Sequence, residues 1–189
     1  MTKIRSSPKH RGVLIGLKVL VYDIESAQTI FSDGFYGKPL GVQKPKGTED
    51  VRSPLVLSLI EALYLVEQGK LEVVDTNGNP LGFDRMYSYG VENIPKFELL
   101  YKVYKEFRQR GFVLRSALKY GADFAVYERG PGLEHAPYLV HVLKQGQEID
   151  PLEIVRAGRL SHSVRKKFIL AITSPSGVSK YLAFEWSKP

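Results

Sequence analysis

Short alternations of apolar and polar residues dominate the N-terminal third of the chain. Residues 13–15 and 17–21 alternate on either side of Gly16, which predicts two short strands or one bent strand. Residues 24–33 have the spacing of a short helix, and residues 70–74 have that of a further strand. This part of the chain is therefore expected to mix small helices with short strands.

The clearest helical pattern follows Ser53. Serine accepts hydrogen bonds from the first free amides of a helix, and Pro54 suits the first helical position because it has no amide hydrogen. Gly69 provides a left-handed stop. Between them, apolar residues recur at helical spacing: Leu55, Leu59, Ala62, Leu63 and Val66. The pattern predicts a helix that begins at Ser53 and ends before Gly69.

A second helical pattern starts at Pro95 and ends at Gly111. Its apolar stripe consists of Phe97, Leu100, Tyr101, Tyr104 and Phe107. The pattern then changes to that of strands, over residues 112–119, 122–128, 137–144, 167–173 and 179–186. A capping sequence at Asp150 predicts a short helix to Gly158.

These elements predict a mixed α+β fold in two domains. A small N-terminal α/β domain is expected over residues 13–90, and a C-terminal domain with helices packed on a mixed sheet over residues 91–189. Residues 1–12 carry five Lys, Arg or His residues and no acid, and are expected to form a flexible basic tail.

The composition excludes several classes of function. Zero cysteines exclude disulfides, thiolate chemistry and zinc sites built with cysteine. No apolar run approaches the ~20 residues of a membrane span, and the N-terminus lacks a secretory signal, so a cytoplasmic protein is expected. The 27 basic and 20 acidic residues give a net charge of +7, which favours a polyanionic partner, most simply nucleic acid.

Common enzyme signatures are absent from the sequence. The chain has no P-loop, no G-x-G-x-x-G after a strand, and neither H-E-x-x-H nor G-x-S-x-G. Asp123 is the only obvious carboxylate on the C-terminal strands, which disfavours a metal-dependent DNA nuclease. What remains is a polar set, Tyr127, His135 and Lys166, which would converge at one sheet end if their strands are neighbours.

This polar set suits metal-free cleavage of RNA, which needs a base for the 2′-hydroxyl, an acid for the departing 5′-oxygen and a cation for the phosphate. Histidine titrates near neutral pH, whereas tyrosine, with an ordinary pKa of about 10, needs cationic neighbours to act as a base. Structural roles stay open: Tyr127 as an amphipathic strand residue, His135 as a solvated loop histidine, residues 165–167 as a solvated basic stretch. His141 is expected to be structural, and His162 is a weaker candidate for the site.

The same residues resemble the archaeal tRNA-splicing endonuclease family, whose catalytic domain is shared with the eukaryotic splicing endonuclease subunits. The resemblance runs in order over nearly the whole chain. The segments that carry it are residues 34–37, 57–65, 120–127, 135–142 and 159–167.

The resemblance implies a restriction-endonuclease-like catalytic domain and excision of introns from precursor tRNA at a bulge-helix-bulge fold. It implies no metal or other cofactor, with 2′,3′-cyclic phosphate and 5′-hydroxyl ends. Tyr127 matches the family's general base, His135 its general acid and Lys166 its transition-state cation. Arg159 matches the first of two arginines that sandwich a flipped bulge base, and Arg165 adds positive charge beside it; the second arginine has no clear match.

Assembly and partners follow from the same resemblance. The loop over residues 174–179 is acidic in relatives but carries no acid here, so a heterotetramer with a noncatalytic paralogue is favoured over a homotetramer. The polar stretch over residues 38–50 is long, and Lys44 and Lys46 are expected to contact RNA phosphates, unless the loop is merely solvated. The alternative function is a noncatalytic RNA-binding or structural subunit of the same complex.

Overall fold

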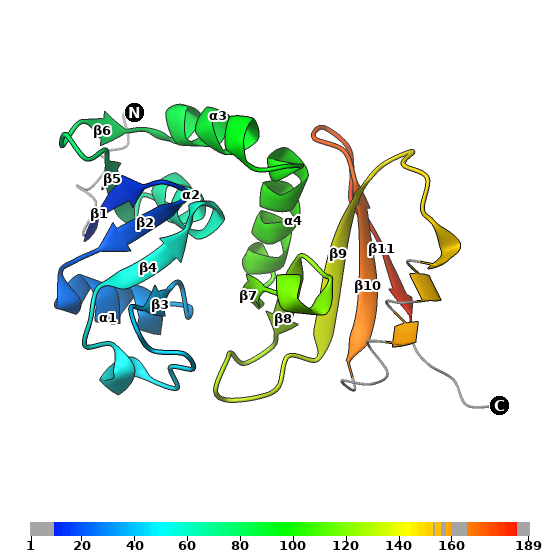
Figure 1. The fold of residues 1–189 in the computed structure, drawn as a ribbon, viewed down its shortest axis with the longest axis horizontal. Helices are drawn as coiled ribbons and strands as arrows, with labels where there is room; N and C mark the ends of the chain where they lie inside the picture. The colour runs from blue at the N-terminus through cyan, green and yellow to red at the C-terminus, as the bar shows by residue number, and fades with distance from the viewer. Residues whose placement is uncertain (1–9, 153, 156–157, 160–165, 185–189) are drawn as a thin grey trace, which may run out of the picture. The chain divides into compact units, whose positions relative to one another are not determined.

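The structure is a computed structural model that describes residues 10–152, 154–155, 158–159 and 166–184. The chain divides into two compact units, residues 1–97 and residues 98–189. Each unit contains helices and one sheet, which confirms the expected mixed α+β fold (Figure 1). Among the described residues, no helix has the length and apolar character needed to cross a membrane.

The N-terminal sheet has the order β3-β4-β2-β1-β5-β6. Strand β1 (His10–Ile15) runs antiparallel to β2 (Lys18–Val21) and parallel to β5 (Leu71–Val74). Gly16, with a φ of 56°, lies in the tight turn between β1 and β2, so the two short strands are confirmed and the single bent strand is wrong. Residues 10–12 belong to β1 rather than to a basic tail, because their backbone pairs with β5.

The helix expected from Ser53 begins only at residue 59. Residues 55–58 form strand β4 (Leu55–Ser58), in which Leu55 and Leu57 are fully buried, and α2 covers Leu59–Glu67. Ser58 caps α2: its Oγ accepts from the Glu61 amide at 3.3 Å, and Glu61 Oε2 accepts from the Ser58 amide at 2.8 Å. This capping box sets the start of the helix, so the signal taken from Ser53 and Pro54 was wrong.

Two helices, a 3₁₀ turn and the two edge strands of the sheet complete the N-terminal unit. Helix α1 (Ile24–Ser32) is capped by Asp23, whose Oδ2 accepts from the Ser26 amide at 2.8 Å. The sequence did not predict α3 (Phe83–Asn93), in which only Met86 and Gly90 are buried. The shorter elements are β3 (Lys38–Pro39), the 3₁₀ turn η1 (Thr48–Asp50) and β6 (Pro80–Leu81).

The C-terminal sheet has the order β11-β10-β9-β8-β7. Strands β9 and β10 are parallel, and the other neighbours are antiparallel. The five strands fall inside the predicted ranges or match them: β7 (Val113–Ser116), β8 (Phe124–Tyr127), β9 (Tyr138–Lys144), β10 (Lys167–Thr173) and β11 (Lys180–Phe184). A 3₁₀ turn, η2 (Leu118–Tyr120), connects β7 to β8.

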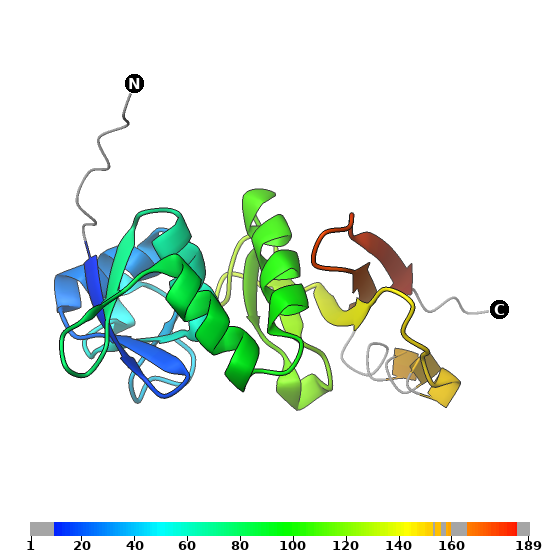
Figure 2. The same cartoon turned by 90° about the horizontal axis from the view of Figure 1, so that it is seen from above.

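Helix α4 (Phe97–Gln109) lies alongside the C-terminal sheet (Figures 1 and 2), with the Tyr104 and Phe124 rings 6.0 Å apart. The helix begins two residues after Pro95, close to its predicted start. Strand alternation and register place a second apolar cluster on the opposite face of the sheet; it includes Ala125, Leu139, Phe168 and Leu170. Both faces of this sheet are therefore packed.

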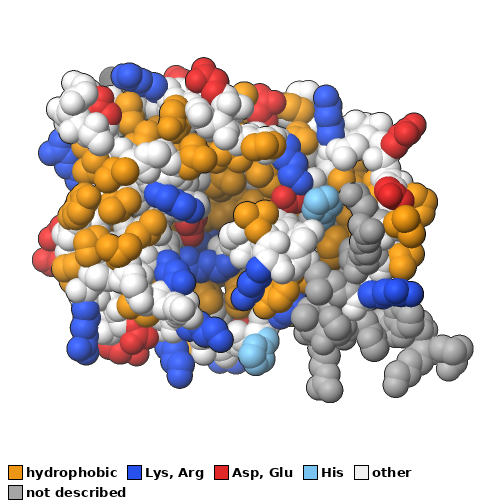
Figure 3. Space-filling model, in the orientation of Figure 1, with side chains coloured by type: hydrophobic (Ala, Val, Ile, Leu, Met, Phe, Trp, Pro, Cys, Tyr) orange, Lys and Arg blue, Asp and Glu red, His pale blue; other side chains and the backbone are white. Residues whose placement is uncertain are grey.

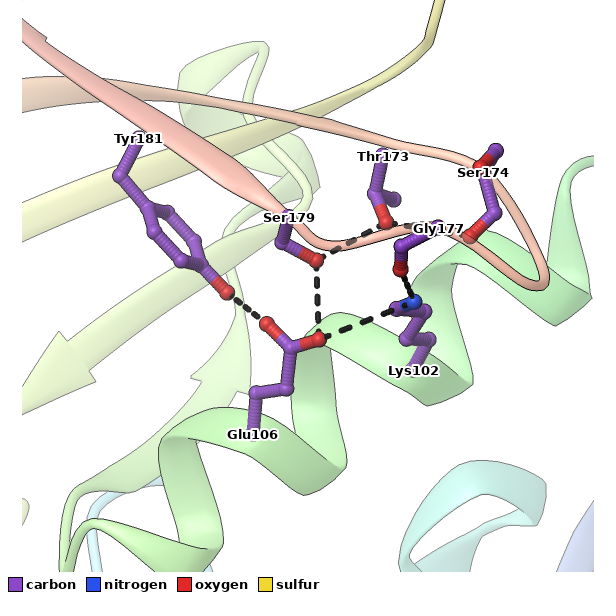
Figure 4. A network of polar contacts seen from close by, with 7 residues as sticks. All are labelled: Lys102, Glu106, Thr173, Ser174, Gly177, Ser179 and Tyr181. Carbon is purple, nitrogen blue, oxygen red and sulfur yellow. Dashed lines mark hydrogen bonds and ion pairs between the residues drawn. The ribbon is translucent and has the colours of Figure 1, made fainter.

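A polar network ties the loop between β10 and β11 to α4 (Figure 4). Glu106 accepts hydrogen bonds from Ser179 Oγ, at 2.9 Å, and from the Tyr181 hydroxyl. Lys102 donates to the carbonyl of Gly177, and Ser179 Oγ lies 2.9 Å from Thr173 Oγ1. One helix thus holds the second half of the loop and the start of β11.

Candidate active site

The ends of three neighbouring strands meet at one edge of the C-terminal sheet. Tyr127 is the last residue of β8, β9 begins at Tyr138, and β10 begins at Lys167. Because β8 is antiparallel to β9 and β9 is parallel to β10, the end of β8 lies beside the starts of the other two. Tyr127, His135 and Lys166 are therefore brought to the same end of the sheet.

Lys166 is held beside the residue that follows His135. Its Nζ donates to the carbonyl oxygen of Ala136, and the next backbone amide, that of Lys167, donates to the Pro137 carbonyl at 2.9 Å. Ala136 is only 4% exposed and belongs to the apolar cluster, so the acceptor for Lys166 is part of the packed interior. The Lys166 ammonium is thus positioned by backbone.

His135 lies in the loop between β8 and β9 and is exposed. The Glu134 carboxylate closes this loop: its Oε1 accepts from the amides of Arg129, at 2.6 Å, and Gly130, at 3.4 Å. The hydrogen bond from the Arg129 amide is the main reason that the pKa of Glu134 lies below its ordinary value. The loop therefore has a defined shape while leaving the His135 ring accessible.

Tyr127 is half-buried and packs against the apolar cluster. Burial raises the pKa of Tyr127 above 10, and Tyr120 and Glu134 contribute in the same direction. The cations of Arg115 and Lys119 act in the opposite sense and lower it. The phenol is accordingly protonated at neutral pH in the free protein.

The other predicted site residues lie outside this cluster or outside the described residues. Arg159 is helical and exposed, and Arg165 and His162 lie outside the described residues. Lys44 and Lys46 belong to the N-terminal unit, where both are exposed on either side of the buried Pro45. Figure 3 shows several Lys and Arg side chains over this part of the N-terminal unit.

His141 is part of the β-sheet framework, as its alternation with apolar residues predicted. Its Nδ1 lies 3.1 Å from Asp123 Oδ2, and the same oxygen accepts from the Val142 amide at 2.7 Å. Asp123 precedes β8, at the opposite end of that strand from Tyr127. In the described part of the chain, no group of three His, Asp or Glu side chains is placed to hold a metal ion.

Sequence reasoning missed the groups that surround the three strand ends. Arg115, Lys119 and Glu134 act electrostatically on Tyr127, and the Tyr138 hydroxyl donates to Glu128 Oε1 at 2.9 Å. The available signals were Arg115 and Lys119, two cations inside the predicted strand over residues 112–119. The positions of Glu134, Glu128 and Tyr138 relative to the site depend on strand register and loop closure, which the sequence does not give.

Comparisons with known proteins match both units of the chain. The family model described as the tRNA intron endonuclease N-terminal domain matches residues 10–87, and that of the catalytic C-terminal domain matches residues 97–181. The second range contains Tyr127, His135 and Lys166. These two matches define the class of protein as an endonuclease with a separate N-terminal domain.

Archaeal relatives extend the similarity over nearly the full length. A tRNA-splicing endonuclease of Hyperthermus butylicus is 58% identical over 180 residues, which covers 95% of this chain and 99% of the relative. The corresponding proteins of Sulfurisphaera tokodaii and Saccharolobus solfataricus are 51% and 49% identical, each covering 94% of this chain and 98% of the relative. The chain therefore belongs to the tRNA intron endonuclease family.

Proposed function

We propose that this protein is a cytoplasmic, metal-independent RNA endonuclease that excises introns from precursor tRNA at bulge-helix-bulge sites. Its products would carry a 2′,3′-cyclic phosphate and a 5′-hydroxyl. The observation that carries the proposal is the convergence of Tyr127, His135 and Lys166 at one end of the C-terminal sheet. The family match supports the same substrate class.

The proposed reaction moves two protons and exchanges one bond to phosphorus. Tyr127, as phenolate, takes the proton of the 2′-hydroxyl; the 2′-oxygen bonds to phosphorus, and the 5′-oxygen departs with a proton from His135. Lys166 stabilises the charge that develops on the phosphate oxygens. The exposure of His135 leaves its ring free to reach a departing oxygen, and the bond to Ala136 holds Lys166 beside it.

We propose that Lys44 and Lys46 contact RNA phosphates. Hydrogen bonds within and beside the loop support this role: the Lys46 amide donates to Asp50 Oδ2 at 2.7 Å, and Gln28 Nε2 donates to the Val51 carbonyl at 3.0 Å. An anchored loop presents two cations at low entropic cost. Equal cleavage rates for Lys44→Ala, Lys46→Ala and wild-type enzyme across substrates would contradict this role.

Arg159 and Arg165 are proposed to bind the RNA bulge, with the Arg159 guanidinium stacking on a splayed base. We further propose a heterotetramer with a noncatalytic paralogue, because the loop over residues 174–179 lacks the acids expected of a self-docking loop. A homotetramer predicts cleavage by the purified chain alone, whereas the favoured assembly predicts cleavage only when the paralogue is added.

The decisive experiment incubates the protein, with and without a candidate paralogue, with bulge-helix-bulge RNA in EDTA. A 2′-deoxy substitution at the cleavage site should abolish cutting, because it removes the attacking group. Cleavage that requires magnesium, or that survives the deoxy substitution, would refute the mechanism. The products are identified by a 3′ end that resists phosphatase until acid opens the cyclic phosphate, and by a 5′ end that a kinase labels without prior dephosphorylation.

The alternative is a noncatalytic RNA-binding subunit of the same complex. It would bind the RNA without cutting it alone, and Tyr127→Phe, His135→Ala and Lys166→Ala would leave the activity of the complex unchanged. The retention of all three side chains at one sheet end favours the catalytic function.

A further inference from the structure

The general-base role proposed for Tyr127 leaves a physical problem unsolved. A half-buried phenol favours its protonated form, and its burial here raises the pKa of Tyr127 further from neutrality. Such a group supplies little phenolate at pH 7 unless nearby positive charge stabilises the anion. The bound RNA is itself an anion, so part of that positive charge must come from the protein.

Strand register places one cation on the same face as Tyr127. Val113 pairs with Tyr127 and Arg115 pairs with Ala125, so Arg115 is the diagonal cross-strand neighbour of Tyr127. Directly opposed residues of antiparallel strands share a face, and diagonal neighbours lie ~7–8 Å apart, within reach of a long side chain. Arg115 is half-buried, which limits the screening of its charge by water.

A second cation lies on the turn that leads into β8. Lys119 Nζ is 4.8 Å from the centroid of the Tyr120 ring, and Tyr120 packs with Tyr127 against the apolar cluster. Lys119 is exposed, so its charge is better screened than that of Arg115. The groups that act on the phenol are thus Arg115 from β7, Lys119 and Tyr120 from η2, and Glu134 from the following loop.

We propose that Arg115 is a positioning residue for the reaction: its guanidinium stabilises the anionic form of Tyr127, with Lys119 in a weaker supporting role. The inference rests on the proposed base role of Tyr127. Among the groups that oppose the effect of burial, the Arg115 charge has the largest influence, which agrees with its register and burial.

Single-turnover cleavage from pH 6 to pH 10 tests the proposal. We expect Arg115→Ala to slow cleavage roughly tenfold at pH 7, the effect of one partly screened charge at this range. The difference in rate between Arg115→Ala and the wild type should shrink as pH rises, because the phenolate then forms in both enzymes. Arg115→Lys should recover most of the rate, and Lys119→Ala should show a smaller loss with the same pH trend.

Lys144→Ala is the matched control, because it removes an exposed cation from the opposite end of β9. Its pH profile should coincide with that of the wild type. A loss of activity in Arg115→Ala that is the same at every pH, or that Arg115→Lys does not restore, would overturn the proposal. If Arg115→Ala does not fold, Arg115→Met and Lys119→Ala make the same test.

A direct titration separates this inference from the proposed function. NMR of protein labelled with carbon-13 tyrosine reports the ionisation of Tyr127 without substrate. The Tyr127 signal is assigned as the one that disappears in Tyr127→Phe. Arg115→Ala should move that titration to higher pH, and an unchanged titration would refute the inference. A moved titration combined with full activity in Tyr127→Phe would uphold the electrostatic link and refute the base role instead.

Discussion

Loss of Glu106 should loosen the attachment of the β10–β11 loop to α4. The carboxylate accepts from Ser179 Oγ at 2.9 Å and from the Tyr181 hydroxyl, and it lies 4.0 Å from Lys102 Nζ. Its side chain is 26% exposed. Glu106→Ala removes both acceptors while leaving the helix intact, because alanine is the best helix former.

The size of the effect follows from these contacts. A hydrogen bond to a charged group contributes about 1.5–3 kcal/mol, and water can replace part of it at a partly exposed site. The Lys102 ion pair adds under ~1 kcal/mol, because it is long and partly solvated. We expect Glu106→Ala to lower the free energy of unfolding by about 2–3 kcal/mol, and Glu106→Gln, which keeps one acceptor, by about half as much.

The Tyr181 hydroxyl gives this network a pH dependence. Burial, together with the hydrogen bond to Glu106, raises the pKa of Tyr181 well above 10. The folded state therefore holds the phenolic proton more tightly than the unfolded state does. The stabilisation that Tyr181 gives the folded state is complete below the unfolded tyrosine pKa of about 10. It is lost as pH rises through the folded pKa.

Urea unfolding of the wild type, Glu106→Ala, Tyr181→Phe and the double variant measures the coupling. We expect the double variant to lose less unfolding free energy than the sum of the losses in the two single variants, by about 1 kcal/mol. The stability gap between wild type and Tyr181→Phe should narrow from pH 10 upward. Strict additivity at pH 7, or a gap that stays constant to pH 11, would refute the network as described.

Three further changes test other parts of the structure. His135→Ala should slow cleavage roughly 10²–10⁴-fold without changing stability, because the ring is exposed; an unaffected rate in single-turnover assays would remove it from the site. Glu61→Ala should cost about 2–4 kcal/mol in urea unfolding, since the buried carboxylate accepts from the Gly37 and Ser58 amides, and Glu61→Gln serves as the milder control. Gly90→Ala should destabilise by about 1–3 kcal/mol despite better helix propensity, because a Cβ would lie 2.3 Å from Phe97 Cε1; an increased melting temperature would contradict this packing.

The C-terminal strands could be predicted because their alternation and turns are local signals. Residues 167–173 form β10 with the bounds that the pattern predicted, and β8 and β9 lie within theirs. The order of the strands has no local signal. The parallel pairing of β9 with β10 joins residues about 30 positions apart, and this pairing carries Lys166 to the site.

Two errors in the N-terminal unit have physical causes. The helix start was placed at Ser53 although Ser58 and Glu61 form the capping box, and the alternating Leu55 and Leu57 are buried strand residues. Helix α3 carries Phe83, Met86 and Tyr87 at helical spacing, a local signal that was overlooked, although only Met86 and Gly90 are buried. Tertiary packing thus explains the first error, and the second is a missed local signal.

The candidate site shows where sequence reasoning ends. Residue types alone allowed Tyr127, His135 and Lys166 as a site, the family resemblance assigned their roles, and their convergence depended on strands whose adjacency was an assumption. The structure adds the means by which they are held: Lys166 by the Ala136 carbonyl, and the His135 loop by the Glu134 carboxylate on two backbone amides.

The contacts that hold Lys166 and shape the His135 loop run to backbone rather than among the three proposed catalytic side chains. A side chain anchored to a carbonyl or an amide keeps its place when its neighbour is replaced, so single substitutions in the trio should remove chemistry without displacing the remaining groups. That separation makes the trio suited to kinetic dissection. It also explains why the electrostatic environment of Tyr127, supplied from β7 and η2, needs to be tested apart from the trio itself.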